Sequence, residues 1–141
     1  MKSKLFYDFV AGAWLMIWPH DAKAQFEALY SFTDGFDGAD PNAGLIFDPT
    51  GTILYGTTSQ GGANGEGAVF AYDITAPPGT GLTTLYSFSA VQDGANPVAG
   101  VVLSIDGQTL YGTTTFGGIP DAGVVFAVQT DGSTVEPLSP L

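Results

Sequence analysis

The chain of 141 residues contains no cysteine, and its few basic residues all lie near the amino terminus. Without cysteine, it can form neither a disulfide framework nor a thiolate zinc site. Lys2, Lys4 and Lys23 are the only lysines, arginine is absent, and His20 is the only histidine. From Gln25 onward, the chain therefore carries no basic side chain and no imidazole.

These absences exclude several classes of function for the chain beyond residue 24. A Ser-His-Asp triad needs a histidine to move the proton, and a Schiff-base enzyme needs a lysine. Zinc sites are built mostly from cysteine and histidine. A surface with acidic but no basic side chains repels phosphate backbones and anionic lipids. We therefore expect no nucleic-acid partner and no membrane attachment of this part.

Residues 1–24 are typical of a signal peptide. Two lysines precede an apolar stretch at 5–18, and Ala22 and Ala24 place small side chains at the spacing that a signal peptidase requires. The apolar stretch is shorter than the roughly 20 residues that span a bilayer, which disfavours an uncleaved membrane anchor. We expect cleavage before Gln25 and a secreted or cell-surface protein.

The rest of the chain contains an internal duplication. The pentapeptide LYGTT occurs at 54–58 and again at 110–114, which is 56 residues later. Residues 29–71 and 85–127 align without insertion and share 22 identities in 43 positions. Self-similarity at a fixed spacing is the signature of a repeat architecture.

Each repeat unit contains four predicted strands, so the predicted fold class is all-β. The strands are rich in β-branched and aromatic residues and are bounded by Gly, Pro or Asp. They lie at 26–32, 44–47, 53–58 and 67–73 in the first unit, and at 82–88, 100–105, 109–114 and 124–129 in the second. We place the units at 25–80 and 81–141, separated by the stiff loop at 77–79. The second range includes the start of a third strand set at 134–138.

Four strands in such a unit match one blade of a β-propeller, which is typically about 40–50 residues long. Blades bury their faces against neighbouring blades, so two of them cannot close a ring. The chain would assemble with copies of itself, form part of a longer repeat protein, or fold back as a small sandwich or barrel. We favour the first two. The prediction is two tandem four-stranded antiparallel sheets that form a partial propeller or one completed by oligomerisation.

The pattern LYSF…DGA.P.AG…LYGTT..GG…G.VF resembles the GloVer-type tandem repeat of bacterial exported proteins, over about residues 26–138. The resemblance implies an extracellular or surface-anchored protein with propeller-type blades, and it implies no particular activity. Members of that family usually carry more than two copies.

The acidic residues offer the remaining route to catalysis. Asp37 and Asp93 are the only carboxylates retained at equivalent positions of both units. Two carboxylates can hydrolyse a glycosidic bond, so a carboxylate-dependent carbohydrate-active enzyme is the alternative function. Most aspartates here precede glycine or lie in turns, where they accept hydrogen bonds from the backbone. We therefore predict no enzyme and no catalytic, cofactor-binding or metal-binding residue.

Two ligand hypotheses stay open beside this prediction. Asp34, Asp37 and Asp40 lie within seven residues, and calcium favours clustered oxygens, although the spacing is not that of an EF-hand. Tyr55 and Tyr111 of the LYGTT segments could stack on a sugar. We favour a structural role for LYGTT, as a strand whose glycine lets an adjacent element approach closely.

The leading functional prediction is an exported, acidic binding or scaffolding module without cofactor. Its expected partners are copies of itself, further repeats of a longer chain, or an extracellular polysaccharide.

Overall fold

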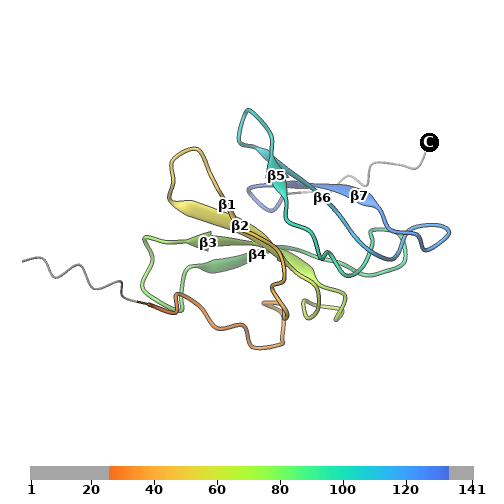
Figure 1. Cartoon of the computed structure of the whole chain (residues 1–141), viewed down its shortest axis with the longest axis horizontal. Helices are drawn as coiled ribbons and strands as arrows, with labels where there is room; N and C mark the ends of the chain where they lie inside the picture. Colours follow the sequence, from red (N-terminus) through yellow and green to blue (C-terminus); the bar gives the residue numbers. More distant parts are fainter. Residues whose placement is uncertain (1–25, 134–141) are drawn as a thin grey trace, which may run out of the picture.

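The computed structural model describes residues 26–133, so the expected signal peptide and the expected strand at 134–138 lie outside the described residues. Within residues 26–133 the chain forms seven strands and no helix, which confirms the all-β prediction (Figure 1). The strands are β1 (Ile46–Phe47), β2 (Ile53–Thr58), β3 (Ala68–Asp73), β4 (Leu82–Ser87), β5 (Val102–Leu103), β6 (Thr109–Thr113) and β7 (Val125–Gln129).

The strands form two antiparallel sheets in chain order. One sheet has the order β1-β2-β3-β4, and the other has the order β5-β6-β7. Tyr55 lies opposite Ala71 in the first sheet, and Tyr111 lies opposite Ala127 in the second. Because both members of each pair are shifted by the repeat spacing, the duplication in the sequence is also a duplication of strand register.

The prediction of two four-stranded sheets is wrong in one respect. Residues 26–32, predicted as a strand, pair with no strand among the described residues. The fourth strand of the first sheet is instead β4, which follows the loop at 77–79. The second sheet has three strands, and residues 26–133 form no closed propeller. Residues 26–32 and 82–88 share one pattern, but a strand also needs a partner edge, and only 82–88 lie beside β3.

Two predicted strands are shorter in the structure, and the second of them runs into the turn at 104–107. The strand predicted at 44–47 reduces to β1, and the strand predicted at 100–105 reduces to β5. In the hairpin after β5, the Gly107 amide donates to the Ser104 carbonyl at 3.0 Å. Gly107 has a φ of 73°, a backbone conformation that glycine adopts at little cost.

The hydrophobic core lies between the two sheets. Tyr55 and Val69 of the first sheet are buried against Leu110, Phe126 and Val128 of the second. Full burial of side chains of this size stabilises the fold by about 1.5–3 kcal/mol each. This core uses one face of each sheet. On the opposite face of the first sheet, Phe70 and Tyr72 are also buried, and Phe32 and Tyr30 pack on them.

Candidate functional site

Equivalent positions of the two sheets differ in exposure, and this difference locates the candidate site. Thr57 and Val69 lie opposite each other in the β2–β3 ladder, so they share a face with Tyr55. Val69 is 0% exposed and Tyr55 is 6% exposed. Tyr55 and Val69 belong to the core shared with the second sheet. We call this side of the first sheet its covered face.

The same side of the second sheet is uncovered. Val125 is the counterpart of Val69 and is 57% exposed, and Tyr111 is the counterpart of Tyr55 and is 40% exposed. Val102 lies opposite Tyr111 and is also exposed. We call this surface the open face; it comprises Val102, Tyr111, Thr113 and Val125.

The first sheet has the reverse asymmetry on its other side. Val101 is 3% exposed in the core, whereas its counterpart Leu45 is 52% exposed. Phe47 is likewise exposed, while its counterpart Leu103 packs against the core. We call Leu45 and Phe47 the outer face. The first sheet is thus uncovered on this side only at Leu45 and Phe47, because Phe70 and Tyr72 of the same side are buried.

The β7 edge of the second sheet also has no partner strand among the described residues. In the first sheet β3 is flanked by β2 and β4, but its counterpart β7 pairs only with β6 within residues 26–133. An edge strand presents a row of unpaired backbone N–H and C=O groups. Because Val125 belongs to both β7 and the open face, the free edge and the open face form one continuous surface.

The LYGTT segments have the structural role that we expected. Gly56 lies opposite Phe70, and Gly112 lies opposite Phe126. A Cβ atom on Gly112 would lie 2.4 Å from Cζ of Phe126. The glycine therefore leaves room for a phenylalanine ring to cover the neighbouring strand.

The structure does not join the two tyrosines of these segments into one sugar-binding surface. Tyr55 is buried in the core, and Tyr111 lies on the open face. The Thr57 hydroxyl donates a 3.0 Å hydrogen bond to the Ala99 carbonyl, whereas the counterpart Thr113 is exposed. The first LYGTT segment therefore connects the sheets, and only the second one faces solvent.

Asp37 closes a turn in the first unit. Its Oδ2 accepts hydrogen bonds from the Tyr30 hydroxyl at 2.9 Å and from the Thr33 amide at 2.8 Å, and its Oδ1 accepts one from the Thr33 hydroxyl at 2.6 Å. Desolvation alone would raise the pKa of Asp37, but the hydrogen bonds from Thr33 and Tyr30 outweigh it and hold the pKa at about 2. This carboxylate is therefore ionised and engaged in its own turn.

Asp93 repeats this arrangement in the second unit. It accepts hydrogen bonds from the Tyr86 hydroxyl at 2.6 Å and from the Ser89 hydroxyl at 2.7 Å. Burial, followed by the hydrogen bond to Asp93, raises the pKa of Tyr86 well above its ordinary value. Both retained carboxylates thus organise the segment that follows a tyrosine, as their positions in turns indicated.

The acidic loop at 34–40 does not gather its carboxylates. Asp37 is held by the turn described above, and Asp40 accepts a hydrogen bond from the Gln60 side chain. Among the described residues, no three His, Cys, Asp or Glu side chains form a group that could hold a metal ion. The structure therefore does not bring Asp34, Asp37 and Asp40 together.

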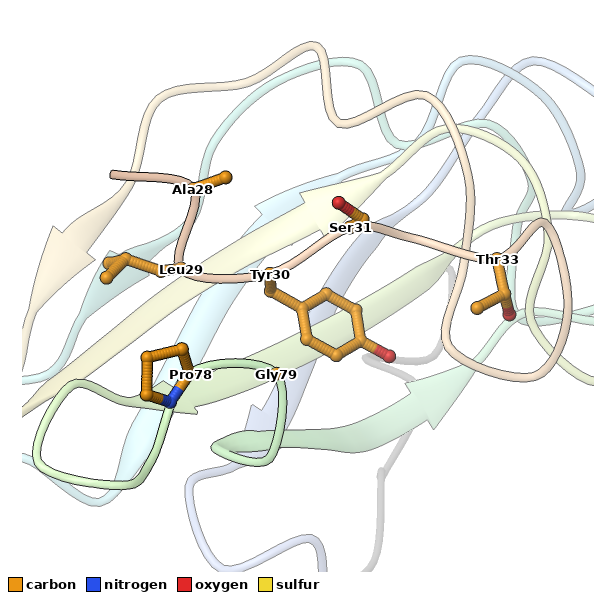
Figure 2. A pocket seen from close by; sticks show the side chains of 7 residues that line it. All are labelled: Ala28, Leu29, Tyr30, Ser31, Thr33, Pro78 and Gly79. Atoms are coloured by element: carbon orange, nitrogen blue, oxygen red, sulfur yellow. The ribbon is translucent and has the colours of Figure 1, made fainter. Parts of the chain in front are cut away.

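A shallow groove lies between the segment at 28–33 and the loop at 77–79 (Figure 2). Leu29 and Tyr30 line one side and Pro78 the other, and its volume is about 430 Å³. The Gly79 amide donates a 2.9 Å hydrogen bond to the Leu29 carbonyl, which holds the loop against the segment. All lining side chains are uncharged.

The sequence alone did not distinguish the open face from the covered one. Val69 and Val125 are the same residue in the same local motif, yet they have opposite environments. The available signal was the copy number, because two stacked sheets must leave one face uncovered at each end.

In the part of the chain that the structure describes, no helix is long and apolar enough to cross a membrane.

Comparison with known proteins agrees with this repeat structure. The family model of the Gloeobacter/Verrucomicrobia repeat matches residues 15–140. No curated protein and no solved structure gives a significant match. The matched region contains both sheets, both LYGTT segments and both Tyr-Asp turns. The chain therefore belongs to the Gloeobacter/Verrucomicrobia (GloVer) repeat family, as its repeated pattern predicted.

Proposed function

We propose that this chain is an exported scaffolding module, which acts by associating through its uncovered sheet surfaces and does not turn over a substrate. One observation carries the proposal: Val69 is 0% exposed, whereas Val125 at the same position of the second unit is 57% exposed. A face that forms core in one unit and is uncovered in the next suits the packing of another unit. The occupant is a second copy or a further repeat of a longer chain.

The open face supplies a driving force for such association. Val102, Tyr111 and Val125 expose apolar surface on adjacent strands. Each square ångström of apolar surface removed from water contributes about 25 cal/mol. Contiguous apolar patches on soluble proteins commonly mark interaction sites.

The carboxylates support binding over the alternative of a carbohydrate-active enzyme. A glycosidase places two carboxyl groups on either side of one bond, about 5–9.5 Å apart. Asp37 and Asp93 are each bonded within their own unit, to residues a few positions earlier in the chain. The hydrogen bonds that these two aspartates accept are those of turn residues.

A polysaccharide is a second candidate ligand, because of the groove beside Tyr30. The groove is open, uncharged and flanked by the rings of Tyr30 and Pro78 (Figure 2). Aromatic side chains combine an apolar face with a polar tip, which suits contact with a sugar ring. Binding there would be compatible with a scaffold outside the cell.

Export is the part of the proposal that depends on residues 1–24. Their positive start, apolar stretch and small residues before Gln25 motivate it. Mass spectrometry of the chain recovered outside a bacterial host should give a protein that begins at Gln25. Recovery of the intact chain from the cytoplasm alone would contradict export.

Sedimentation equilibrium of the chain, purified as the cell makes it, tests the scaffolding role. We expect association at micromolar concentration, and we expect Val125→Lys to weaken it because a buried lysine would be left unpaired. Ile105→Lys is the matched control, because Ile105 is an exposed apolar residue outside the open face. A stable monomer, or turnover of a polysaccharide that is lost in Asp37→Ala or Asp93→Ala, would contradict the proposal.

A further inference from the structure

We propose that residues 26–31 of a second copy add to the free edge of β7, so that copies join head to tail. In this assembly the outer face of one copy covers the open face of the next. The inference rests on the proposed scaffolding function and names its partner, which is the chain itself.

The chain already contains this interface once. β4 pairs with β3 in the first sheet, and β4 also contacts β7 of the second sheet. Beyond β4, Phe88 enters the core and packs on Phe126, with ring centroids 5.0 Å apart at an angle of 63°. The segment at 82–88 thus completes one sheet and then joins the next.

Residues 26–32 repeat this segment but complete no sheet among the described residues. Leu-Tyr-Ser-Phe at 29–32 is identical to the sequence at 85–88. Phe32 packs on Phe70 with ring centroids 5.2 Å apart at 66°, as Phe88 packs on Phe126. Residues 26–32 therefore pack their phenylalanine on a sheet as 82–88 do, but they do not pair with the edge strand of a preceding sheet.

The backbone of this segment is available for pairing. Within the described range, the amides of residues 26–32 donate no hydrogen bond. Phe26 is 93% exposed, although its counterpart Leu82 is a partly buried residue of β4. β-Strand addition joins a segment with unpaired backbone groups to an unpaired sheet edge, and residues 26–31 and β7 are such a segment and such an edge.

The Leu29 carbonyl is the one backbone group of the segment with described partners, and it does not obstruct this pairing. It accepts hydrogen bonds from the Gly79 amide at 2.9 Å and from the Tyr72 hydroxyl at 2.7 Å. Its counterpart Leu85 is the residue skipped at the bulge of the β3–β4 ladder, where Tyr86 and Thr84 pair with consecutive residues of β3. Leu29 would be skipped in the same way.

The strand must come from another copy. Residues 26–32 lie at the opposite end of the molecule from β7, on the far side of the first sheet (Figure 1). One chain therefore cannot bring its own segment to its own β7 without breaking the ring contacts of Tyr30 and Phe32 on the first sheet. A second copy can do so, and it would place Leu45 and Phe47 over the open face as Val101 and Leu103 now lie over the covered face.

The repeat spacing also predicts the register of the new pairing. Val69 lies opposite Tyr86, and Ala71 lies opposite Thr83. Subtracting 56 from the β4 residue and adding 56 to the β3 residue pairs Val125 with Tyr30 of the second copy. By the same shift, Ala127 pairs with Glu27.

The interface is heterologous, because it joins different surfaces of two identical chains. Repeating it either closes a ring or continues as a filament. Propellers typically have about four to eight blades, which corresponds to about two to four copies of this chain.

Disulfide trapping tests this register. Because the chain has no cysteine of its own, only the introduced cysteines can form a disulfide. Chains carrying Glu27→Cys are mixed with chains carrying Ala127→Cys and oxidised under mild conditions. Opposite residues of antiparallel strands have Cα atoms about 4.5–5.5 Å apart, which a disulfide can span. We expect at least about tenfold more mixed dimer than from Glu27→Cys with Ile105→Cys, because docking raises the effective concentration of the matched pair.

The chain offers a matched positive control. Ala71→Cys and Thr83→Cys in one chain occupy the equivalent intramolecular pair, so they should form an intrachain disulfide. Hydrogen exchange on the unmodified chain is the second measurement. The amides of β7 should become about tenfold more protected as the protein concentration rises through the association range.

The outcomes separate the two proposals. Association without the Glu27–Ala127 disulfide, when the intrachain control closes, would overturn the proposed partner strand and leave the scaffolding role intact. A monomer whose β7 amides are protected at every concentration would show that this edge is covered within one chain. That result would overturn both proposals.

Discussion

The hydroxyl of Tyr86 donates a 2.6 Å hydrogen bond to Oδ2 of Asp93, and Tyr30 makes the same bond to Asp37 at 2.9 Å in the first unit. Each pair joins the segment at 26–32 or 82–88 to the loop that follows it and leads to the next sheet. The hydrogen bond between the tyrosine of this segment and the aspartate of the following loop thus fixes the direction in which the chain turns.

We expect Tyr86→Phe to lower the free energy of unfolding by about 1–2 kcal/mol. The change removes a hydrogen bond to a charged acceptor and leaves Asp93 with its Ser89 partner. Urea denaturation measures the change. Tyr111→Phe is the control, because the Tyr111 hydroxyl forms no hydrogen bond within the described residues, and its effect should stay within about 0.5 kcal/mol. Equal losses in the two variants would contradict this role.

The pH dependence of stability should follow the aspartates in turns. Hydrogen bonds hold the pKa of Asp37 at about 2, and hydrogen bonds led by those from the Thr50 side chain and the Ile53 amide hold that of Asp48 at about 2. Both values lie below the ordinary pKa of about 3.9 for an unfolded aspartate. Such groups contribute stability that is complete above about pH 4 and is lost as the pH falls through about 2.

Thermal unfolding from about pH 6 to about pH 2 tests this expectation. The difference in melting temperature between the natural chain and Asp37→Asn should shrink as the pH falls, because protonation removes the same charge. Asp34→Asn is the control, because no hydrogen bond to the Asp34 side chain is found in residues 26–133. A difference that is constant across this range would exclude the carboxylate charge as its source.

Gly112→Ala should destabilise the fold by about 1–3 kcal/mol, the usual cost of overpacking. The new methyl group would lie 2.4 Å from Cζ of Phe126, and that ring is buried in the core. Gly44→Ala is the matched control, because no atom lies within 4 Å of its added Cβ. Differential scanning calorimetry should show a lower melting temperature for the first variant only.

Association should strengthen with salt. The whole chain has a formal net charge of −11, so copies repel each other at low ionic strength. Salt screens that repulsion over a Debye length of about 8–10 Å, whereas contact between apolar faces persists. Sedimentation in increasing sodium chloride should give a decreasing dissociation constant. Dissociation by salt would contradict an interface made of apolar faces.

Calcium should not change the melting temperature. Asp37 is engaged by Tyr30 and Thr33, and Asp40 by Gln60. Melting curves after chelation, with and without millimolar calcium, measure this directly. An upward shift with calcium, absent in Asp34→Asn, would reveal a site that the acidic loop forms on binding.

Much of the fold could be predicted because it depends on neighbours along the chain. The β-branched and aromatic composition of 53–58 and 109–114 predicted β2 and β6, which the structure confirms with small changes at the ends. The glycine of LYGTT was expected to admit a close neighbour, and Phe70 and Phe126 are those neighbours. The turn role of Asp37 was likewise readable from its position before glycine.

The pairing of the strands could not be predicted in the same way. Residues 29–32 and 85–88 are identical, yet only 85–87 belong to a strand that pairs with β3. The difference comes from what lies beside each segment in space, and this depends on how many copies precede and follow it.

Strand content, turn chemistry and the duplicated unit follow from the order of residues, because they arise from local backbone preferences and periodicity. Which faces are buried was decided only by packing in space, both of one sheet on the other and of residues 30–32 on the first sheet. Val69 and Val125 show this most directly: their local sequences match, but Val69 faces the second sheet and Val125 faces solvent. Burial is a property of contacts in space, so two identical segments acquire different roles from their positions in the stack.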